Sequence, residues 1–147
     1  MNDLSTVTNI PSTSKDIDLY LMSKACDLAD KGNLINPPVE HWIENGVYYR
    51  ATFYPAYSIA ISCMIKVPTT IVVAGNCLVT VGDHVEHLLG IRRIEASANR
   101  RVAYKTLDGG VFILMYFKTS ATTVEDAEHE MTDEYSLLTN HREELDT

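Results

Sequence analysis

The basic residues with the most suggestive spacing lie in the second half of the chain. Five of the twelve Lys and Arg residues fall within 14 positions, at Arg92, Arg93, Arg100, Arg101 and Lys105. On adjacent strands such side chains can converge on a phosphate or a carboxylate, because a guanidinium donates two parallel hydrogen bonds to either group. The alternative is a solvated or ion-paired sheet face, matched to acidic residues of the C-terminal tail. The sequence leaves both interpretations open.

Residues that could bind a metal or act as nucleophiles are poorly spaced. In a strand, His84 shares a face with Glu86 and points away from His87, so we interpret this segment as a surface turn with fortuitous imidazoles. No GxSxG motif accompanies the serines. The cysteines are odd in number and contain no CxxC pair, which indicates free thiols: Cys26, Cys63 and Cys77.

The charge is distributed unevenly along the 147 residues. The formal net charge is -8, and from Glu125 onward there are nine acidic residues and one basic residue, so the preceding body is neutral. A neutral body with an acidic tail makes nucleic acid an unlikely partner, because phosphate neutralisation needs clustered Lys and Arg. A basic protein is a better match for the tail. The longest apolar run, residues 111–117, is too short to span a membrane, and no signal-peptide pattern is present, so we expect a cytoplasmic protein without a membrane partner.

The N-terminal part predicts a flexible arm followed by one amphipathic helix. Residues 1–14 are rich in Ser, Thr and Asn and have no apolar period, which is typical of a flexible arm. Ser14 is a plausible N-cap and Gly32 a stop signal for a helix over residues 15–32. One face of this helix carries apolar residues at helical spacing: Ile17, Leu21, Ala25 and Leu28.

After residues 36–38 the period changes to two, which predicts strands. We expect them near 46–54, 58–66, 69–74, 77–82, 84–89, 91–96, 101–106 and 110–117, with a loop before the first. Short strands with tight turns indicate an antiparallel sandwich or barrel. Thr122 and Glu125 then match a capping box for a short closing helix. Residues 132–147 form an acidic tail, either frayed or a docking segment for a partner anchored by Tyr135, Leu137 and Leu138.

Three stretches are similar to one known family: HWIENGVYYRATFYPAYS, TTIVVAGNCLVTV and IEASANRRVAYKTLDGGVFILMYF. They resemble, in order, a His followed by a Gly-aromatic-Arg strand and a Pro-Ala-Gly turn, a strand-turn-strand around Gly75, and a basic residue before a Val-x-Tyr strand. This pattern resembles the small single-domain cupins of bacteria and bacteriophages, with Tyr57 in place of one turn glycine. The resemblance implies a mainly β, cupin-like antiparallel jelly-roll barrel over residues 40–131, and a homodimer.

Metal-binding members of the cupin superfamily carry histidines at positions where this chain has other residues. Here Cys63 and Ile65 stand near the expected ligands of the first strand, and residues 114–117 stand near the last. Apolar and aromatic side chains cannot hold a divalent ion, so we expect a degenerate metal site, with no metal and no cofactor. The barrel interior would then be a filled core or an apolar pocket, lined by these residues or their strand neighbours: Cys63, Ile65, Val73, Tyr104, Leu114 and Tyr116.

We therefore predict a non-catalytic cupin-like binding protein, encoded by a phage or mobile element. It would sequester an anionic small molecule or bind a host protein through its helix and acidic tail. The predicted ligand contacts are Arg101 first and Arg50 second, together with Tyr104 and Arg92. The alternatives are a small metal-dependent cupin enzyme with atypical ligands, such as an isomerase, lyase or dioxygenase, and a virion structural or assembly protein.

Overall fold

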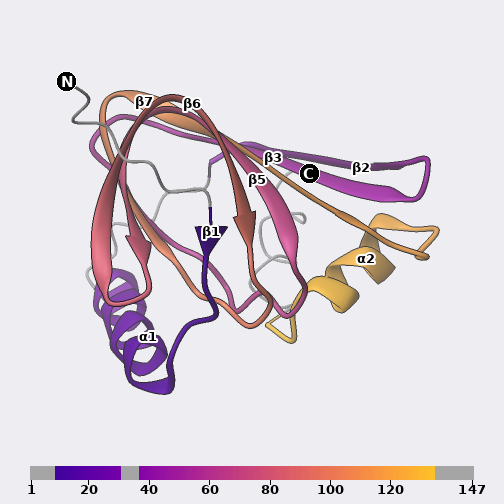
Figure 1. The fold of residues 1–147 in the computed structure, drawn as a ribbon, viewed down its shortest axis with the longest axis horizontal. Coiled ribbons are helices and arrows are strands. Elements are labelled where there is room, and N and C mark those ends of the chain that lie inside the picture. Colours follow the sequence, from indigo (N-terminus) through magenta and orange to yellow (C-terminus); the bar gives the residue numbers. More distant parts are fainter. Residues whose placement is uncertain (1–8, 31–36, 135–147) are drawn as a thin grey trace.

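The computed structural model describes residues 9–30 and 37–134, which form seven strands and two helices (Figure 1). In chain order these are β1 (Asn9–Ile10), α1 (Lys15–Asp30), β2 (Val39–Glu44), β3 (Val47–Tyr54), β4 (Ile59–Ile61), β5 (Thr69–Val81), β6 (His84–Ala96), β7 (Ala103–Lys118) and α2 (Val124–Met131). The predicted mainly β fold class, with an N-terminal helix and a short C-terminal helix, is confirmed.

The strands form one curved sheet with the order β1-β6-β5-β7-β3-β2, and β4 pairs with β7 off this path. All pairs are antiparallel except β1 with β6. Both helices lie below the arch of the sheet, so its concave face is the inner one (Figure 1). Within the described residues β1 and β2 remain separate edges, which makes the jelly-roll-like sheet an open one rather than a closed barrel.

The three longest strands bend together at a row of glycines. Gly75 of β5 is paired with Gly90 of β6 and with Val111 of β7. Its φ is +143°, and a Cβ at this position would lie 2.5 Å from the carbonyl oxygen of Gly110. Only glycine, which has no Cβ, tolerates such a close approach. A bulge follows between Gly75 and Cys77, and the sheet bends at this point.

In both helices the buried apolar residues are those of the face expected from their spacing. In α1, Leu21 is buried and Ile17, Ala25 and Leu28 are partly buried. The backbone N–H of Ile17 donates to the Ser14 hydroxyl at 3.3 Å, which confirms the predicted N-cap. In α2, the buried residues Ala127 and Met131 join a core cluster with Tyr48, Ile65 and Phe117.

The structure corrects several predicted boundaries. The N-cap of α2 is Thr123, which accepts from the Asp126 N–H at 3.1 Å, rather than Thr122. The segment read as a loop before the first strand is β2, and the two pairs of short strands over 69–82 and 84–96 are single long strands, as is 103–118. A glycine or polar pair inside a long bent strand imitates a turn signal in the sequence.

The predicted flexible arm contributes to the sheet over its described part. Ile10 is fully buried and pairs with Ala96 in β1–β6 contact, and Thr13 N–H donates to the carbonyl oxygen of Asn99 at 3.0 Å. Burial of one isoleucine therefore orders a stretch that composition alone reads as an arm. No helix in residues 9–30 or 37–134 is long and apolar enough to cross a membrane.

Candidate ligand-binding site

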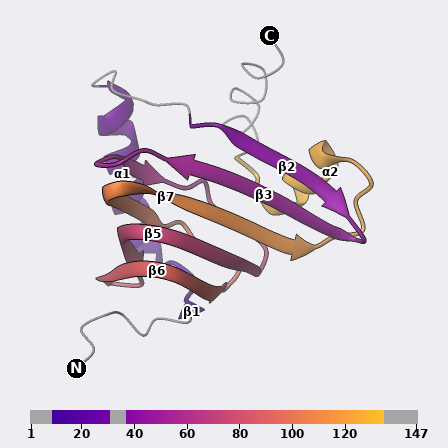
Figure 2. The same ribbon diagram turned by 90° about the horizontal axis from the view of Figure 1, so that it is seen from above.

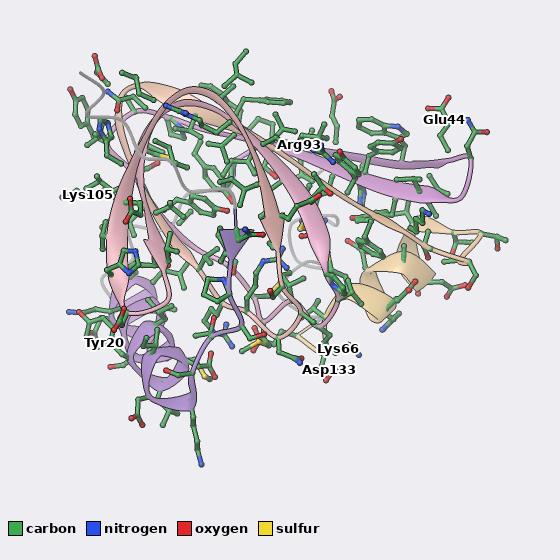
Figure 3. All side chains as sticks on the ribbon, in the orientation of Figure 1. Tyr20, Glu44, Lys66, Arg93, Lys105 and Asp133 are labelled. Carbon is green, nitrogen blue, oxygen red and sulfur yellow. The ribbon has the colours of Figure 1, made fainter. Side chains whose placement is uncertain are left out.

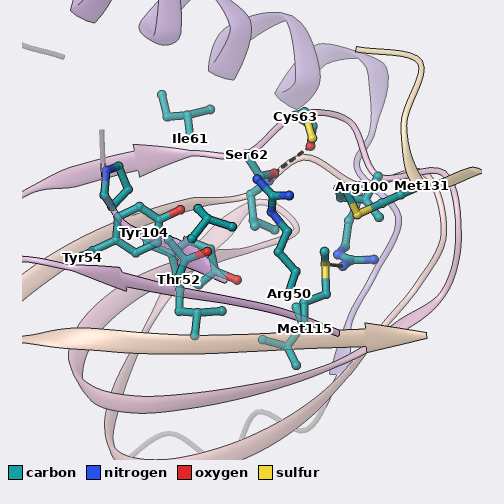
Figure 4. Close-up of a pocket in the computed structure, with 16 residues that line it drawn as sticks. Arg50, Thr52, Tyr54, Ile61, Ser62, Cys63, Arg100, Tyr104, Met115 and Met131 are labelled. Carbon is teal, nitrogen blue, oxygen red and sulfur yellow. Dashed lines mark hydrogen bonds between the residues drawn. The ribbon is translucent and has the colours of Figure 1, made fainter. Parts of the chain in front are cut away.

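A cavity of about 290 Å³ lies on the inner face of the sheet, at the small end of the range for ligand pockets (Figure 4). Its walls are mostly apolar: Ile61, Ile65, Ile71, Val102, Ile113 and Met115. The polar groups come from Arg50, Thr52, Tyr54, Arg100 and Tyr104, together with Ser62 and Cys63. None of the described residues that line it is acidic. The sequence left two alternatives, a filled core and an apolar pocket. The interior is neither, because it contains a cavity and polar groups line part of that cavity.

Strand alternation places three of these side chains in a row. Arg50, Thr52 and Tyr54 are alternate residues of β3 and therefore point to the same face of the sheet. Tyr104 reaches the same space from β7. Figure 4 shows Thr52, Tyr54 and Tyr104 gathered on one side of the cavity, with Arg50 and Arg100 on the other.

The hydroxyl groups on this side have no partner within the described chain. Thr52, Tyr54 and Tyr104 form no side-chain hydrogen bond with another described residue, although Tyr104 is only 6% exposed. Burial raises the pKa of both tyrosines because the phenolate would lose its hydration, and the nearby Arg50 and Arg100 guanidinium groups only partly offset this. Each phenol is therefore neutral and can donate a hydrogen bond to a group inside the cavity.

Arg50 is held at one nitrogen and open at the others. Its Nη1 donates to the Glu128 carboxylate of α2 at 3.2 Å and to the Tyr48 hydroxyl at 3.3 Å. His41 lies on the other side of this pair, with Nδ1 3.7 Å from the same carboxylate. The Arg50 Nε and Nη2 make no hydrogen bond to the described residues, and Arg50 is one of the residues that line the cavity. The Glu128 contact thus orients the guanidinium and leaves donors available.

Arg100 is a buried cation without a carboxylate partner among the described residues. The residue is 1% exposed, and its guanidinium donates to the carbonyl oxygens of Val67 at 3.3 Å and Ser97 at 3.0 Å and to the Thr69 hydroxyl. Its Nε has no hydrogen-bond partner in the part of the chain that the structure describes. Burial lowers the pKa of this guanidinium because the charged form loses hydration, yet an arginine remains charged near neutral pH. A buried positive charge that has hydrogen-bond acceptors, but no carboxylate partner among the described residues, therefore borders the cavity.

Arg101, the first predicted ligand contact, is not among the residues that line the cavity. Its Nε donates to Asp18 of α1 at 2.6 Å, its Nη1 donates to the Ser62 carbonyl oxygen at 3.1 Å, and both terminal nitrogens contact the Glu134 carboxylate. These carboxylates raise the pKa of the guanidinium, and Arg101 in turn lowers the pKa of Glu134. The guanidinium is occupied by partners that tie both ends of the described chain to the sheet.

The basic cluster does not converge as a unit. Arg92 lies on β6 with its Nε 3.3 Å from the Leu89 carbonyl oxygen and does not line the cavity, while Arg93 pairs with Glu95 at 3.4 Å on the outer face. Figure 3 shows Arg93 and Lys105 on different parts of the molecule. Of the four predicted ligand contacts, Arg50 and Tyr104 line the cavity and Arg101 and Arg92 do not.

The interior was predicted to be lined by six residues or their strand neighbours, and the structure places each of the six, or a strand neighbour, there. Cys63, Ile65 and Tyr104 line the cavity and Val73 is in the core, but Ile113 and Met115 replace Leu114 and Tyr116. Burial raises the pKa of the Cys63 thiol, so it is neutral rather than a thiolate nucleophile. The four predicted ligand contacts did not include Thr52, Tyr54 or Arg100, although Arg100 belonged to the basic cluster. The alternation from Arg50 would have found the first two.

The other sites considered from the sequence are the histidine pair, a metal site and the partner-binding residues of the tail. His84 Nε2 lies 2.9 Å from Glu86, whereas His87 contacts Asn76, as strand alternation predicted. In the described ranges, no group of three His, Cys, Asp or Glu side chains is placed to hold a metal ion. The predicted partner anchors Tyr135, Leu137 and Leu138 lie outside the described residues.

Part of the chain aligns with solved structures, several of which are cupins. One is the Cupin_2 domain of an XRE family transcriptional regulator from Enterobacter cloacae, with a TM-score of 0.47 and 11% identity over 56% of this chain and 96% of that one. A cupin superfamily protein from Desulfitobacterium hafniense has a TM-score of 0.45 and 13% identity over 63% and 88%. A protein of unknown function from Rhizobium leguminosarum has a TM-score of 0.48 and 10% identity over 64% and 91%. No family model and no curated protein sequence matches significantly. These similarities concern the fold and carry no activity to this chain.

Proposed function

We propose that the protein is a non-catalytic binding protein that sequesters a small anionic molecule in the cavity. The observation that carries the proposal is the buried Arg100 guanidinium, which borders the cavity without a carboxylate partner among the described residues. A buried charge is costly unless it is compensated, and an anion in the cavity would supply the compensation.

The donors around the cavity fit one anionic head group. Arg50 offers Nε and Nη2, and these planar donors match a carboxylate or a phosphate. The hydroxyls of Tyr54, Tyr104 and Thr52 add neutral donors on the opposite side. The apolar walls favour a ligand whose remaining atoms are carbon, and the volume limits it to the size of a small metabolite.

The neutral state of the ionisable lining groups argues against a nucleophilic mechanism. Cys63, Tyr54 and Tyr104 all have a raised pKa, so no thiolate or phenolate is available near neutral pH. The same neutral phenols are suited to donate hydrogen bonds to a bound anion.

The proposal is tested by native mass spectrometry of the purified protein, followed by thermal unfolding with inorganic phosphate and a panel of small carboxylates. A ligand present at one hundred times its Kd stabilises the folded state by about 2.7 kcal/mol, which is a shift of roughly 5 to 10 °C for a chain of this length. We expect at least one member of the panel to give such a shift.

Tyr104→Phe is the variant that separates binding from folding. It removes a hydroxyl that has no partner among the described residues, so stability without ligand stays equal or rises. Affinity falls about tenfold, which corresponds to about 1.4 kcal/mol. Tyr57→Phe is the matched control, because Tyr57 is 76% exposed and lies outside the cavity. A retained transition metal, or a Tyr104→Phe protein that binds as tightly as the control, would overturn the proposal.

A further inference from the structure

The outer face of the sheet is apolar and has no helix over it. Both helices lie on the concave side, and Figure 2 views the five strands β2, β3, β7, β5 and β6 side by side from the opposite side. Large side chains stand on this outer face: Trp42, Tyr49, Phe53, Phe112, Leu114 and Tyr116. Phe112 belongs to the central strand of the five and is still 43% exposed. Contiguous exposed apolar surface of this kind marks an interaction site.

One row of paired residues crosses all five strands and carries opposite charges at its ends. Glu40 pairs with Ala51, Ala51 with Leu114, Leu114 with Val72, and Val72 with Arg93. Leu114 is therefore the middle residue, with two apolar neighbours between two charges. Arg93 is 69% exposed at its side chain and Glu40 is exposed.

Side-chain size is also distributed asymmetrically about β7. The β3 side carries Tyr49 and Phe53, whereas the β5 side carries Thr70 and Ala74 in the same two rows. Tyr49 and Thr70 both flank Tyr116, and Phe53 and Ala74 both flank Phe112. The surface thus has a raised half and a lower half.

We propose that this outer face binds a second copy of the chain, face to face, about a two-fold axis that runs parallel to the strands above Leu114. This rotation places β3 over the partner's β5, so that large residues meet small ones. It also places Glu40 over Arg93 of the partner subunit, twice by symmetry. A two-fold axis perpendicular to the strands would instead set like strands opposite each other and bring Arg93 near its own copy, which is unfavourable.

The location of the interface is tested by one substitution at its centre. The unmodified protein should be a dimer by light scattering coupled to size exclusion at about 50 µM, and Leu114→Arg should make it monomeric. Val85→Arg is the matched control, because Val85 is an exposed apolar residue at the far end of β6 and its variant should remain dimeric. Far-UV circular dichroism checks that each variant is folded. A monomeric unmodified protein, or a folded Leu114→Arg dimer, would exclude this face, the latter in favour of pairing between strand edges.

The axis is tested by reversing the two charges. Glu40→Arg and Arg93→Glu should each weaken the dimer at least tenfold, because each creates two like-charge contacts, and the double variant should restore the dissociation constant to within threefold. A double variant as weak as the single ones would refute the parallel axis, while leaving the result for Leu114→Arg intact. Ligand binding in the cavity is on the other face of the sheet, so these results are independent of the proposed function.

Discussion

Replacing Arg101 by alanine should destabilise the protein strongly, although the sequence suggested that this residue contacts a ligand. The guanidinium joins Asp18 of α1 and Glu134, just after α2, to the sheet, and it also bonds the Ser62 carbonyl oxygen. The side chain is 6% exposed, whereas the two carboxylates are 22% and 29% exposed. The arginine is thus the buried centre of the cluster.

The magnitude follows from the two charged contacts. Hydrogen bonds to charged groups contribute about 1.5 to 3 kcal/mol each, and the partly exposed carboxylates recover some hydration when the arginine is removed. We therefore expect a loss of about 3 kcal/mol, or a fall in Tm of about 6 to 12 °C for a chain of this length. Arg101→Lys should lose less, because it keeps the charge but provides fewer directed donors.

Urea unfolding followed by far-UV circular dichroism measures this loss, provided that the m-value is unchanged. Lys66→Ala is the control, since Lys66 and its partner Asp133 are 36% and 83% exposed at their side chains and the pair should contribute less than about 1 kcal/mol. If Arg101→Ala stays within about 0.5 kcal/mol of the unmodified protein, the structural role is wrong. If it also loses a bound anion, the sequence-based role as a ligand contact is restored.

Two further predictions concern acid stability and the bend of the sheet. Arg101 lowers the pKa of Glu134 below its usual 4.5, so the stabilisation from this carboxylate is complete above about pH 4.5 and is lost as the pH falls through the lowered value. Glu134→Gln should therefore lose less stability between pH 5 and pH 3 than the unmodified protein. An equal loss in the two proteins would contradict the assignment. Gly75→Ala should lower the free energy of unfolding by more than about 3 kcal/mol, because the new Cβ would lie 2.5 Å from the Gly110 carbonyl oxygen. Gly109→Ala should lower it by about 1 kcal/mol, because only the positive φ of 81° is strained there. Equal unfolding midpoints for the two variants would show that the bend relaxes.

Much of the fold could be predicted from local sequence signals. The apolar face of α1, its Ser14 cap and the change to period two depend on residues close together in the chain, so the sequence indicated both helices and most of the strand residues. The errors occurred where a local signal had a tertiary cause. Gly75 resembled a turn because a glycine that permits a close approach inside a bent strand has the same letter as one that ends a strand.

In the candidate site, too, some residue positions follow from the sequence and others depend on tertiary contacts. Strand alternation from Arg50 predicts that Thr52 and Tyr54 share its face, and this follows from the sequence without a structure. The roles of Arg100 and Arg101 do not follow, because both residues lie outside the named strands, where no period assigns a side chain to a face. Tertiary packing decided that Arg101 contacts Asp18 and Glu134, while Arg100 borders the cavity. The physical reason is distance along the chain, because Asp18 and Glu134, which compensate the charge of Arg101, are 83 and 33 residues away from it.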